Sequence, residues 1–174
     1  MDEKSPFYSA KLKNTPLGDL CIGVSEYGLV AVEWVEKGLD FHEYLTKRFK
    51  RPVETNPGRA SIALQQLDEY LRGKRRNFSI PIDWSVMRSF QRQVLQIVCT
   101  IPYGHTRTYG DIAEELGNRN KARAVGQANA SNPMPLVIPC HRVIGSDDKL
   151  HGYGGGEGLP TKEWLLKMEG AVLT

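Results

Sequence analysis

Short apolar runs rich in Val and Ile are confined to the first 85 residues, and their placement constrains the fold more than any other feature of the sequence. The runs cover residues 7–12, 20–24 and 29–35, and turn signals around Gly18 and Gly28 separate them. β-branched and aromatic residues in short runs bounded by such turns favour strands. The first part of the chain therefore predicts a small sheet.

Two helices and one ambiguous segment complete this first part. Apolar residues at helical spacing predict helices near 41–49 and 60–72, the second with Ile62, Leu64, Leu67 and Leu71 on one stripe. Residues 78–84 contain Pro81 and predict an edge strand or a linker. Together these elements indicate an α/β domain over residues 1–85.

The remaining residues, 86–174, show helical spacing instead. A helix is predicted over residues 90–99, with Val94, Leu95 and Val98 on its inner face. Thr108 followed three residues later by Asp111 resembles a capping box, and Gly117 is a natural helix stop.

Asn118 or Asn120 can cap a further helix that runs to about Ala130, ahead of the breaker Asn132-Pro133. Two short helices joined by a Gly-containing turn are typical of a helix-turn-helix. Residues 86–174 therefore predict a mainly α domain.

Composition is that of an ordinary globular chain. The 174 residues include 23 Lys and Arg against 20 Asp and Glu, a net charge of +3, which by itself does not indicate a nucleic-acid partner. No apolar run approaches the roughly 18 residues needed to span a bilayer, and the charged N-terminus lacks a signal-peptide pattern. Three scattered cysteines indicate reduced thiols. We expect a cytoplasmic protein without a membrane partner.

The predicted second helix of the helix-turn-helix is basic and built from small residues. Residues 118–132 include Arg119, Lys121 and Arg123 and no acid. Such a patch is typical of phosphate binding. Arg123, Gln127 and Ala130 share one face, and Val125 and Ala128 can face the core. The segment alone is equally compatible with a short amphipathic helix that only packs against its neighbour.

The Cys140-His141 pair lies inside an apolar run, residues 136–144. A thiol reacts as thiolate, which a neighbouring imidazole or cation promotes. A buried structural cysteine is the alternative reading, and the one we adopt for Cys21 and Cys99. Ligand spacing for zinc is absent. A cysteine hydrolase is chemically possible, although no oxyanion loop is recognisable.

Five ordered motifs resemble those of the O6-alkylguanine-DNA alkyltransferases, the methylated-DNA–protein-cysteine methyltransferases. The similarity runs nearly without gaps from about Phe90 to Gly170 and is strongest at the pentapeptide around Cys140. The motifs are Ile101-Pro102-Tyr103-Gly104 with Thr108-Tyr109, Ala122 to Gly126 with Asn132-Pro133, Pro139-Cys140-His141-Arg142-Val143, Gly152-Tyr153-x-Gly155-Gly156, and Lys162 to Leu166. The resemblance implies a ribonuclease H-like N-terminal domain and a winged-helix-like C-terminal domain.

The resemblance also implies a reaction. Members of the family repair DNA by direct reversal, moving the O6-alkyl group of guanine, and in some cases the O4-alkyl group of thymine, irreversibly onto their own cysteine. Cys140 matches the nucleophile, His141 the base that acts through a water, and Glu169 the acid that polarises it, a triad by role. Asn132 matches the residue that ties the recognition helix to the active-site segment.

Further residues match positions that hold the base and the DNA. Tyr109 matches the tyrosine that contacts N3 of the base, and the pocket also involves Val143, Tyr153 and Gly154. The nucleotide must be flipped out of the duplex, and Arg123 matches the arginine that fills the vacated space. Other matching DNA contacts, made in the minor groove or to the backbone, are Ala122, Ala124, Gly126, Gln127, Asn118, Gln91, Gly110 and Ser146.

Departures from the family pattern are few. The first domain lacks the Cys/His set that binds zinc in some relatives, so we expect no metal and no cofactor. Asn129 stands where some relatives have a larger apolar residue, which can change the pocket. A monomer on double-stranded DNA is expected, with cooperativity left open. A non-catalytic alkylguanine-binding protein and a winged-helix regulator are the alternatives, and the combination of Cys140, His141 and Glu169 argues against both.

Overall fold

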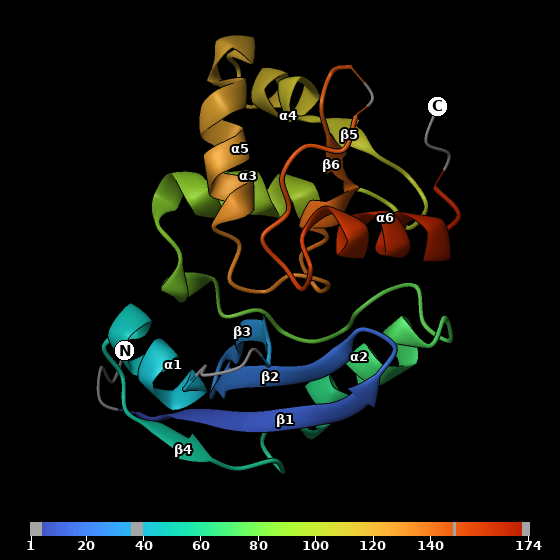
Figure 1. The fold of residues 1–174 in the computed structure, drawn as a ribbon. Helices are drawn as coiled ribbons and strands as arrows, with labels where there is room; N and C mark the ends of the chain where they lie inside the picture. Colours follow the sequence, from blue (N-terminus) through green and yellow to red (C-terminus); the bar gives the residue numbers. More distant parts are fainter. Residues whose placement is uncertain (1–4, 36–39, 148, 172–174) are drawn as a thin grey trace. The chain divides into compact units, whose positions relative to one another are not determined.

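The computed structural model describes residues 5–35, 40–147 and 149–171 (Figure 1). Residues up to Val86 form one compact unit and residues from Met87 a second. None of the helices in these described ranges is long and apolar enough to cross a membrane.

A four-stranded sheet forms the centre of the first unit. The predicted runs become β1 (Phe7–Thr15), β2 (Gly18–Ser25) and β3 (Gly28–Trp34), paired antiparallel in sequence order. A fourth strand, β4 (Val53–Thr55), pairs parallel with β1 and gives the order β3-β2-β1-β4. The sequence analysis did not predict β4, because three residues are too few to show a period.

Helices α1 (Phe41–Phe49) and α2 (Ser61–Leu71) occupy the predicted places. The side chain of Asp40 caps α1 by accepting from the Glu43 amide. The stripe predicted for α2 is wrong in one member, since Ile62 is 61% exposed and Leu64 is half-buried. The buried stripe is Ala63, Gln66, Leu67, Tyr70 and Leu71. Tyr70 and Ala63 complete an i, i+4, i+7 row with Leu67, which fixes the helix face turned to the core.

Residues 78–83 are a linker with a single bridge to the sheet. Ile82 bridges Leu29 in parallel, because the Leu29 amide donates to the Pro81 carbonyl at 2.8 Å and the Asp83 amide donates to the Leu29 carbonyl at 3.0 Å. A short 3-10 turn, η1 (Trp84–Val86), follows. Of the two predicted alternatives, edge strand or linker, the linker is therefore correct.

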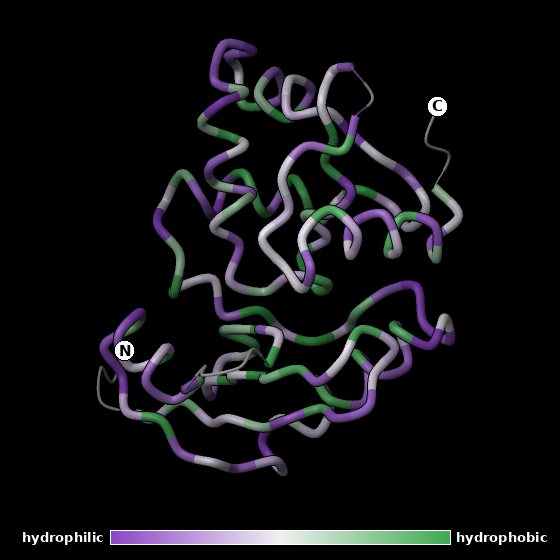
Figure 2. The backbone as a smooth tube through the Cα atoms, viewed as in Figure 1, coloured by the Kyte–Doolittle hydropathy of each residue, from purple (hydrophilic) through white to green (hydrophobic). Residues whose placement is uncertain are grey.

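The second unit is mainly helical. Its elements are α3 (Ser89–Cys99), β5 (Arg107–Thr108), α4 (Tyr109–Glu115), η2 (Arg119–Lys121), α5 (Ala122–Ala130), η3 (Cys140–Arg142), β6 (Val143–Ile144) and α6 (Leu159–Met168). Strands β5 and β6 pair in parallel. Colour alternates between hydrophilic and hydrophobic along the helices in Figure 2, as amphipathic packing requires.

The predicted start and stop signals of α4 are confirmed. Thr108 and Asp111 make both bonds of a capping box, at 3.1 and 2.9 Å. Gly117 follows the last turn with φ +85°, a left-handed conformation that glycine adopts without strain. Asn118 caps η2, the turn that leads into α5. Local bonds thus define the start of α4 and the turn that leads into α5.

The close approach of the linker to β3 makes Gly28 a sensitive position. A Cβ at Gly28 would lie 2.3 Å from the Pro81 carbonyl oxygen, and φ is +144°. We expect Gly28→Ala to lower the free energy of unfolding by at least about 2 kcal/mol, from backbone strain and the clash. Gly73→Ala is the control, since φ is +70° there with nothing within 4 Å, and about 1 kcal/mol is expected. If urea unfolding showed equal losses of unfolding free energy for Gly28→Ala and Gly73→Ala, this explanation would be wrong.

Candidate active site

Cys140 lies in a buried, irregular segment of the second unit. All residues from Pro133 to Gly145 are buried, and Cys140 itself is 6% exposed. The Cys140 amide donates to the Ile138 carbonyl at 2.8 Å, and the Arg142 amide closes the η3 turn on Pro139 at 2.9 Å. Cys140 therefore begins a turn that is fixed at its far end by the pairing of β6 with β5.

A single buried carboxylate joins the residues that follow the thiol. Nε2 of His141 lies 3.0 Å from Oε1 of Glu169, at the C-terminal end of α6. Arg142 donates to the same carboxylate through Nε at 2.9 Å and Nη2 at 2.8 Å, and through Nη1 to the Ile101 carbonyl at 2.6 Å. The side chains of His141 and Glu169 are fully buried. Sequence reasoning missed Arg142, although a cation inside an apolar run signals a buried partner.

Burial and hydrogen bonding shift the pKa values of Glu169 and His141 in opposite directions. Burial raises the pKa of Glu169, but hydrogen bonds from His141 and Arg142 and their charges outweigh it, so the pKa lies well below its ordinary value. Burial lowers the pKa of His141, and the bond to Glu169 only partly opposes it. At neutral pH the carboxylate is therefore ionised and the imidazole neutral. Its Nε2–H points to Glu169, which leaves Nδ1 as the basic nitrogen.

Cys140 rests as a thiol. Burial raises its pKa, while the side chain of Asn132, the charge of Lys162 and the amides of Cys140 and His141 lower it. The cysteine thus differs from cysteines that are ionised at rest, because its proton has to leave as the reaction begins.

Lys162 is a buried cation beside this thiol, and sequence reasoning did not assign it a role. It is 0% exposed. Its Nζ donates to the Val143 carbonyl at 2.7 Å and to the His151 carbonyl at 2.9 Å. Burial lowers its pKa to about 8, and Cys140 opposes that shift. A cation in this position favours a negative charge on the sulfur.

Two asparagines connect α5 to the cysteine segment. Asn132 donates to the Ile138 carbonyl at 2.9 Å and accepts from the Met134 amide at 2.9 Å. Asn129, buried at the end of α5, donates to the Cys140 carbonyl at 3.2 Å. These bonds fix the backbone on both sides of Pro139.

Tyr109 lies against α5. It is the first residue of α4, directly after the capping Thr108, and is half-buried. A Cβ at Gly126 would lie 3.8 Å from its ring. Burial and the charge of Cys140 raise the pKa of Tyr109, and a hydrogen bond from Asn129 lowers it. The phenol is therefore close to both the thiol and Asn129.

Helix α5 presents the predicted two faces. Val125 and Ala128 are buried, whereas Arg123, Gln127 and Ala130 are exposed. Three small residues are half-buried at the borders between these faces, Ala122 and Gly126 on one side and Ala124 on the other. Arg123 makes no ion pair with any residue that the structure describes. By contrast, Arg119 pairs with Glu114 of α4 at 2.8 Å, so the basic patch is narrower than the sequence indicated.

The remaining predicted contact residues are distributed around this site. Gln91 of α3 donates to the carbonyl and hydroxyl of Ser131 at 2.8 and 2.9 Å. Asn118 and Ser146 are exposed, Gly110 and Tyr153 are half-buried, and Val143 is buried with its carbonyl on Lys162. Gly154 is exposed and lies 3.7 Å, measured from an added Cβ, from the Ala130 carbonyl. The loop before α6 therefore approaches the end of α5.

The other two cysteines, Cys21 and Cys99, differ in their exposure to solvent. Cys21 is buried in the core of the first unit, as predicted, and burial raises its pKa. Cys99 is exposed at the end of α3, so the prediction of a buried residue is wrong there. The α3 stripe is Val94, Leu95 and Val98, and Cys99 lies one residue beyond it. Within the described ranges no cluster of three His, Cys, Asp or Glu residues could hold a metal.

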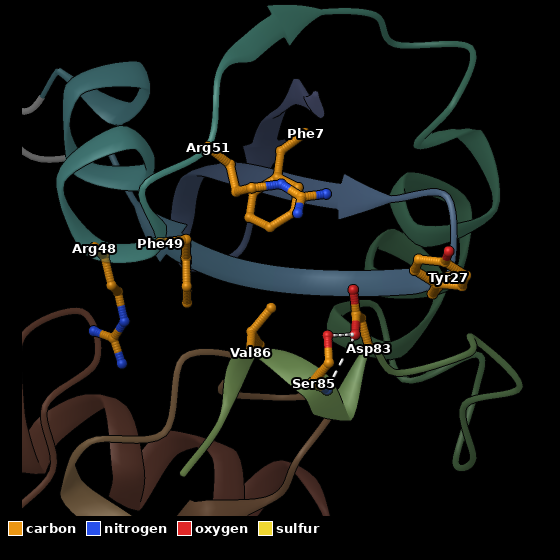
Figure 3. Close-up of a pocket in the computed structure, with 8 residues that line it drawn as sticks. All are labelled: Phe7, Tyr27, Arg48, Phe49, Arg51, Asp83, Ser85 and Val86. Atoms are coloured by element: carbon orange, nitrogen blue, oxygen red, sulfur yellow. Dashed lines mark hydrogen bonds between the residues drawn. The ribbon is translucent and has the colours of Figure 1, made fainter. Parts of the chain in front are cut away.

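The first unit has a cavity of its own, of about 270 Å³ (Figure 3). Its lining comprises Phe7, Tyr27, Arg48, Phe49, Arg51, Asp83, Ser85 and Val86. The carboxylate of Asp83 accepts from the Ser25 and Ser85 hydroxyls at 2.6 and 2.5 Å. Arg51 lies over the ring of Phe7. These polar groups therefore already have partners within the first unit.

The neutral, buried His141 makes stability depend on pH. Its pKa is lower in the folded than in the unfolded state, near 6.5, so the unfolded state binds more protons as the pH falls. We expect the free energy of unfolding to decrease from pH 7 to pH 5, by up to about 1.4 kcal/mol per unit. Urea unfolding at several pH values gives the slope of the unfolding free energy against pH. This slope should be smaller for His141→Gln than for the wild type, and unchanged for His105→Gln, where the side chain is exposed. Parallel slopes in all three proteins would contradict this.

Comparison with known proteins covers both units. A family model described as "6-O-methylguanine DNA methyltransferase, DNA binding domain" matches residues 89–171, and one described as the "ribonuclease-like domain" of the same family matches residues 8–84. A Shigella flexneri protein named methylated-DNA–protein-cysteine methyltransferase is 44% identical over 170 residues, covering 91% of this chain and 94% of its own.

Solved structures are similar over nearly the whole chain. The crystal structure of the Mycobacterium tuberculosis O6-methylguanine methyltransferase has a TM-score of 0.75 and 35% identity, over 95% of this chain and 92% of the other. A crystal structure of OGT from the same organism in complex with DNA has a TM-score of 0.74 and 34% identity, over 94% and 92%. With matches to both of its halves and to full-length relatives, the chain belongs to the 6-O-methylguanine DNA methyltransferase family.

Proposed function

We propose that this protein repairs DNA by transferring the alkyl group of O6-alkylguanine to Sγ of Cys140. The observation that carries the proposal is the buried carboxylate of Glu169, 3.0 Å from the imidazole that directly follows the thiol. An ionised acid and a neutral base beside a protonated thiol form the set that an in-line displacement by sulfur needs. Relatives named as methylated-DNA–protein-cysteine methyltransferases support the same reaction.

The reaction begins with loss of the thiol proton. This proton passes through a water to Nδ1 of His141, and the imidazolium is then stabilised by Glu169, which remains ionised. Lys162 favours the negative charge that appears on Sγ. Because Cys140 is a thiol at rest, deprotonation and attack are coupled in the presence of substrate.

Sulfur then attacks the alkyl carbon. The new S–C bond forms as the C–O6 bond breaks, and the electron pair stays on the guanine oxygen. Tyr109 donates a proton toward N3, so that guanine leaves without a full negative charge, and the proton on His141 replaces the one that Tyr109 gives. The product is an S-alkyl cysteine, a thioether that does not return to a thiol, and each molecule therefore acts once.

The base is held by groups around the cysteine segment. The Cys140 and Val143 carbonyls accept from the exocyclic amine of guanine, since a carbonyl oxygen can accept a second hydrogen bond. Tyr153 and the backbone of Gly154 line the pocket near O6. O4-alkylthymine lacks the amine, so we propose it as a second, poorer substrate.

DNA is bound through α5 in the minor groove. The small, half-buried residues on both borders of the exposed face, Ala122, Ala124 and Gly126, allow close approach of the helix backbone, and Gln127 is exposed on that face. Arg123 inserts into the stack when the damaged nucleotide is flipped out. Asn118, Gln91, Gly110 and Ser146 contact the DNA backbone. A crystal structure of a relative with DNA supports the partner.

We also infer the finer fold assignments. The two compact units act as two domains, divided near the predicted residue 85. The strand order β3-β2-β1-β4, with β1 and β4 parallel, favours a ribonuclease H-like first domain. The α4–α5 pair with the small β5–β6 sheet favours a winged-helix-like second domain. The protein acts as a monomer on double-stranded DNA.

Mass spectrometry after incubation with an O6-methylguanine duplex tests the proposed function. We expect one methyl group per protein, located on Cys140, and no repair beyond one equivalent of lesion. Cys140→Ser should abolish transfer and retain DNA binding, because an alcohol is far less ionised than a thiol near neutral pH. Cys99→Ser is the control and should react normally. Binding without methylation of the wild type would favour a non-catalytic binder or a regulator.

Arg123→Ala tests how the duplex is opened. Extrusion of a paired base costs a few kcal/mol, and the inserted arginine offsets part of this cost. We therefore expect a large rate loss on a paired lesion, a smaller loss on a mispaired or single-stranded lesion, and little loss on free O6-benzylguanine. Rates are measured at saturating protein. An equal rate loss on paired and unpaired DNA would instead indicate that Arg123 contacts a phosphate. In that case the logarithm of the DNA-binding constant should fall less steeply with the logarithm of the salt concentration, by about one unit of slope.

A further inference from the structure

The first unit has a second cavity, of about 300 Å³, at the start of α1. Helix α1 packs on this face of the sheet, because Phe41 and Leu45 belong to one buried cluster with Cys21 of β2. The residues that line the cavity are Ser9, Ala10, Lys11, Cys21, Phe41, His42, Thr55 and Pro57. Since a cavity of about 150 Å³ can hold benzene, this one has room for a ligand of roughly two fused rings.

A buried hydroxyl forms part of the cavity wall. Ser9 lies between Phe7 and Lys11 on one face of β1 and is 6% exposed. Its Oγ lies 2.6 Å from Nε2 of His42, and the hydroxyl of Thr55 lies 3.3 Å from the same nitrogen. Buried sheet positions usually hold β-branched apolar or aromatic residues. The cavity therefore has a polar wall in a part of the sheet where apolar side chains are usual.

The ring nitrogen of His42 cannot fully serve both hydroxyls. Nε2 carries either one hydrogen or one lone pair, and the shorter distance shows that Ser9 is its main partner. Thr55 ends β4, directly beside Ser9 in the parallel pairing with β1, and is exposed. Its hydroxyl can therefore donate a hydrogen bond to an acceptor in the cavity.

Lys11 supplies a positive charge at the same wall. It lies opposite Cys21 in the pairing of β1 with β2, so the two side chains project from the same face. Burial raises the pKa of the Cys21 thiol, and the charge of Lys11 partly opposes this. Lys11 makes no ion pair with any residue that the structure describes. Glu33, which pairs with Cys21 from β3, does not line the cavity, and none of the described lining residues is acidic.

The two kinds of wall define the ligand. A cation and a hydroxyl donor complement a carboxylate, whereas Phe41 and the buried side of Cys21 offer apolar surface to a flat body. We propose that this cavity binds a small carboxylic acid with an aromatic body, its carboxylate near Lys11 and the Thr55 hydroxyl. None of the residues proposed for alkyl transfer lines the cavity, so the inference does not rest on the proposed function.

Titration of the full chain with 2-naphthoic acid, followed by the amide signals in NMR spectra at low ionic strength, tests the site. We expect saturable shifts at the lining residues Lys11, Cys21, His42 and Thr55. The dissociation constant should be about 1 mM or lower, as ordinary ligand efficiency gives for about thirteen non-hydrogen atoms. The neutral 2-naphthamide, which has the same shape, should bind about fivefold more weakly because it lacks the charge.

Matched variants separate the proposed site from general attraction of an anion to lysines. Lys11→Met removes the charge and keeps the apolar stem, so affinity for 2-naphthoic acid should fall about fivefold, the size of one partly exposed ion pair. Its affinity for 2-naphthamide should not change. Lys13→Met is the control, since Lys13 lies two residues further on the same face of β1 and does not line the cavity. Lys11→Gln replaces Lys11→Met if that variant fails to fold.

Thr55→Val tests the hydroxyl at nearly constant volume. We expect a loss of affinity for 2-naphthoic acid of about fivefold, which is typical for one hydrogen bond. The inference would be overturned by unsaturable or absent shifts at the lining residues, or by equal losses for Lys11→Met and Lys13→Met. Equal affinity for the acid and the amide would overturn it as well. Alkyl transfer to Cys140 is not measured in this experiment, so failure of the proposed function is detected separately.

Discussion

The second unit depends on the interactions of one buried carboxylate, that of Glu169. It is buried at the end of α6, and it accepts hydrogen bonds from two consecutive residues that follow the thiol, His141 and Arg142. Arg142 continues to the Ile101 carbonyl at the end of α3. A buried charge left without its partner is strongly destabilising, so these bonds hold the cysteine turn to α6 and to the segment that follows α3. The same buried ion pair therefore contributes to the stability of the second unit and orients the imidazole of His141.

Burial also explains why the thiol is stable until substrate arrives. The apolar segment that encloses Cys140 raises its pKa, and the nearby Lys162 only partly compensates. A protonated, buried sulfur is a weak nucleophile and is protected from adventitious electrophiles. In the single-turnover reaction proposed above, any premature modification of Cys140 is a lost repair event, so such protection is useful.

Much of this structure follows from local sequence signals, and the exceptions have identifiable causes. Thr108, Asp111 and Gly117 determine the limits of α4 through bonds between near neighbours, which a sequence displays directly. Ile62 was assigned to the wrong face because the stripe that faces the sheet includes Tyr70 and Ala63, which an aliphatic pattern overlooks. Arg142 and Lys162 were missed as structural residues because their partners lie 27 and 19 positions away. The roles of Cys140, His141 and Glu169 came from the family resemblance, and no spacing rule would have paired residue 141 with residue 169.

In the proposed function, helix α5 serves both the DNA and the chemistry. Its exposed residues Arg123 and Gln127 lie one turn apart, and its opposite face ends in Asn129, which donates to the Cys140 carbonyl. A shift of the helix toward DNA would therefore be transmitted to the backbone of the nucleophile through a hydrogen bond of 3.2 Å. Because the cysteine segment is also fixed by Asn132 and by the Glu169 ion pair, the helix has little freedom to move independently. In the proposed mechanism, docking of α5 on DNA and alignment of the thiol are then one geometric requirement.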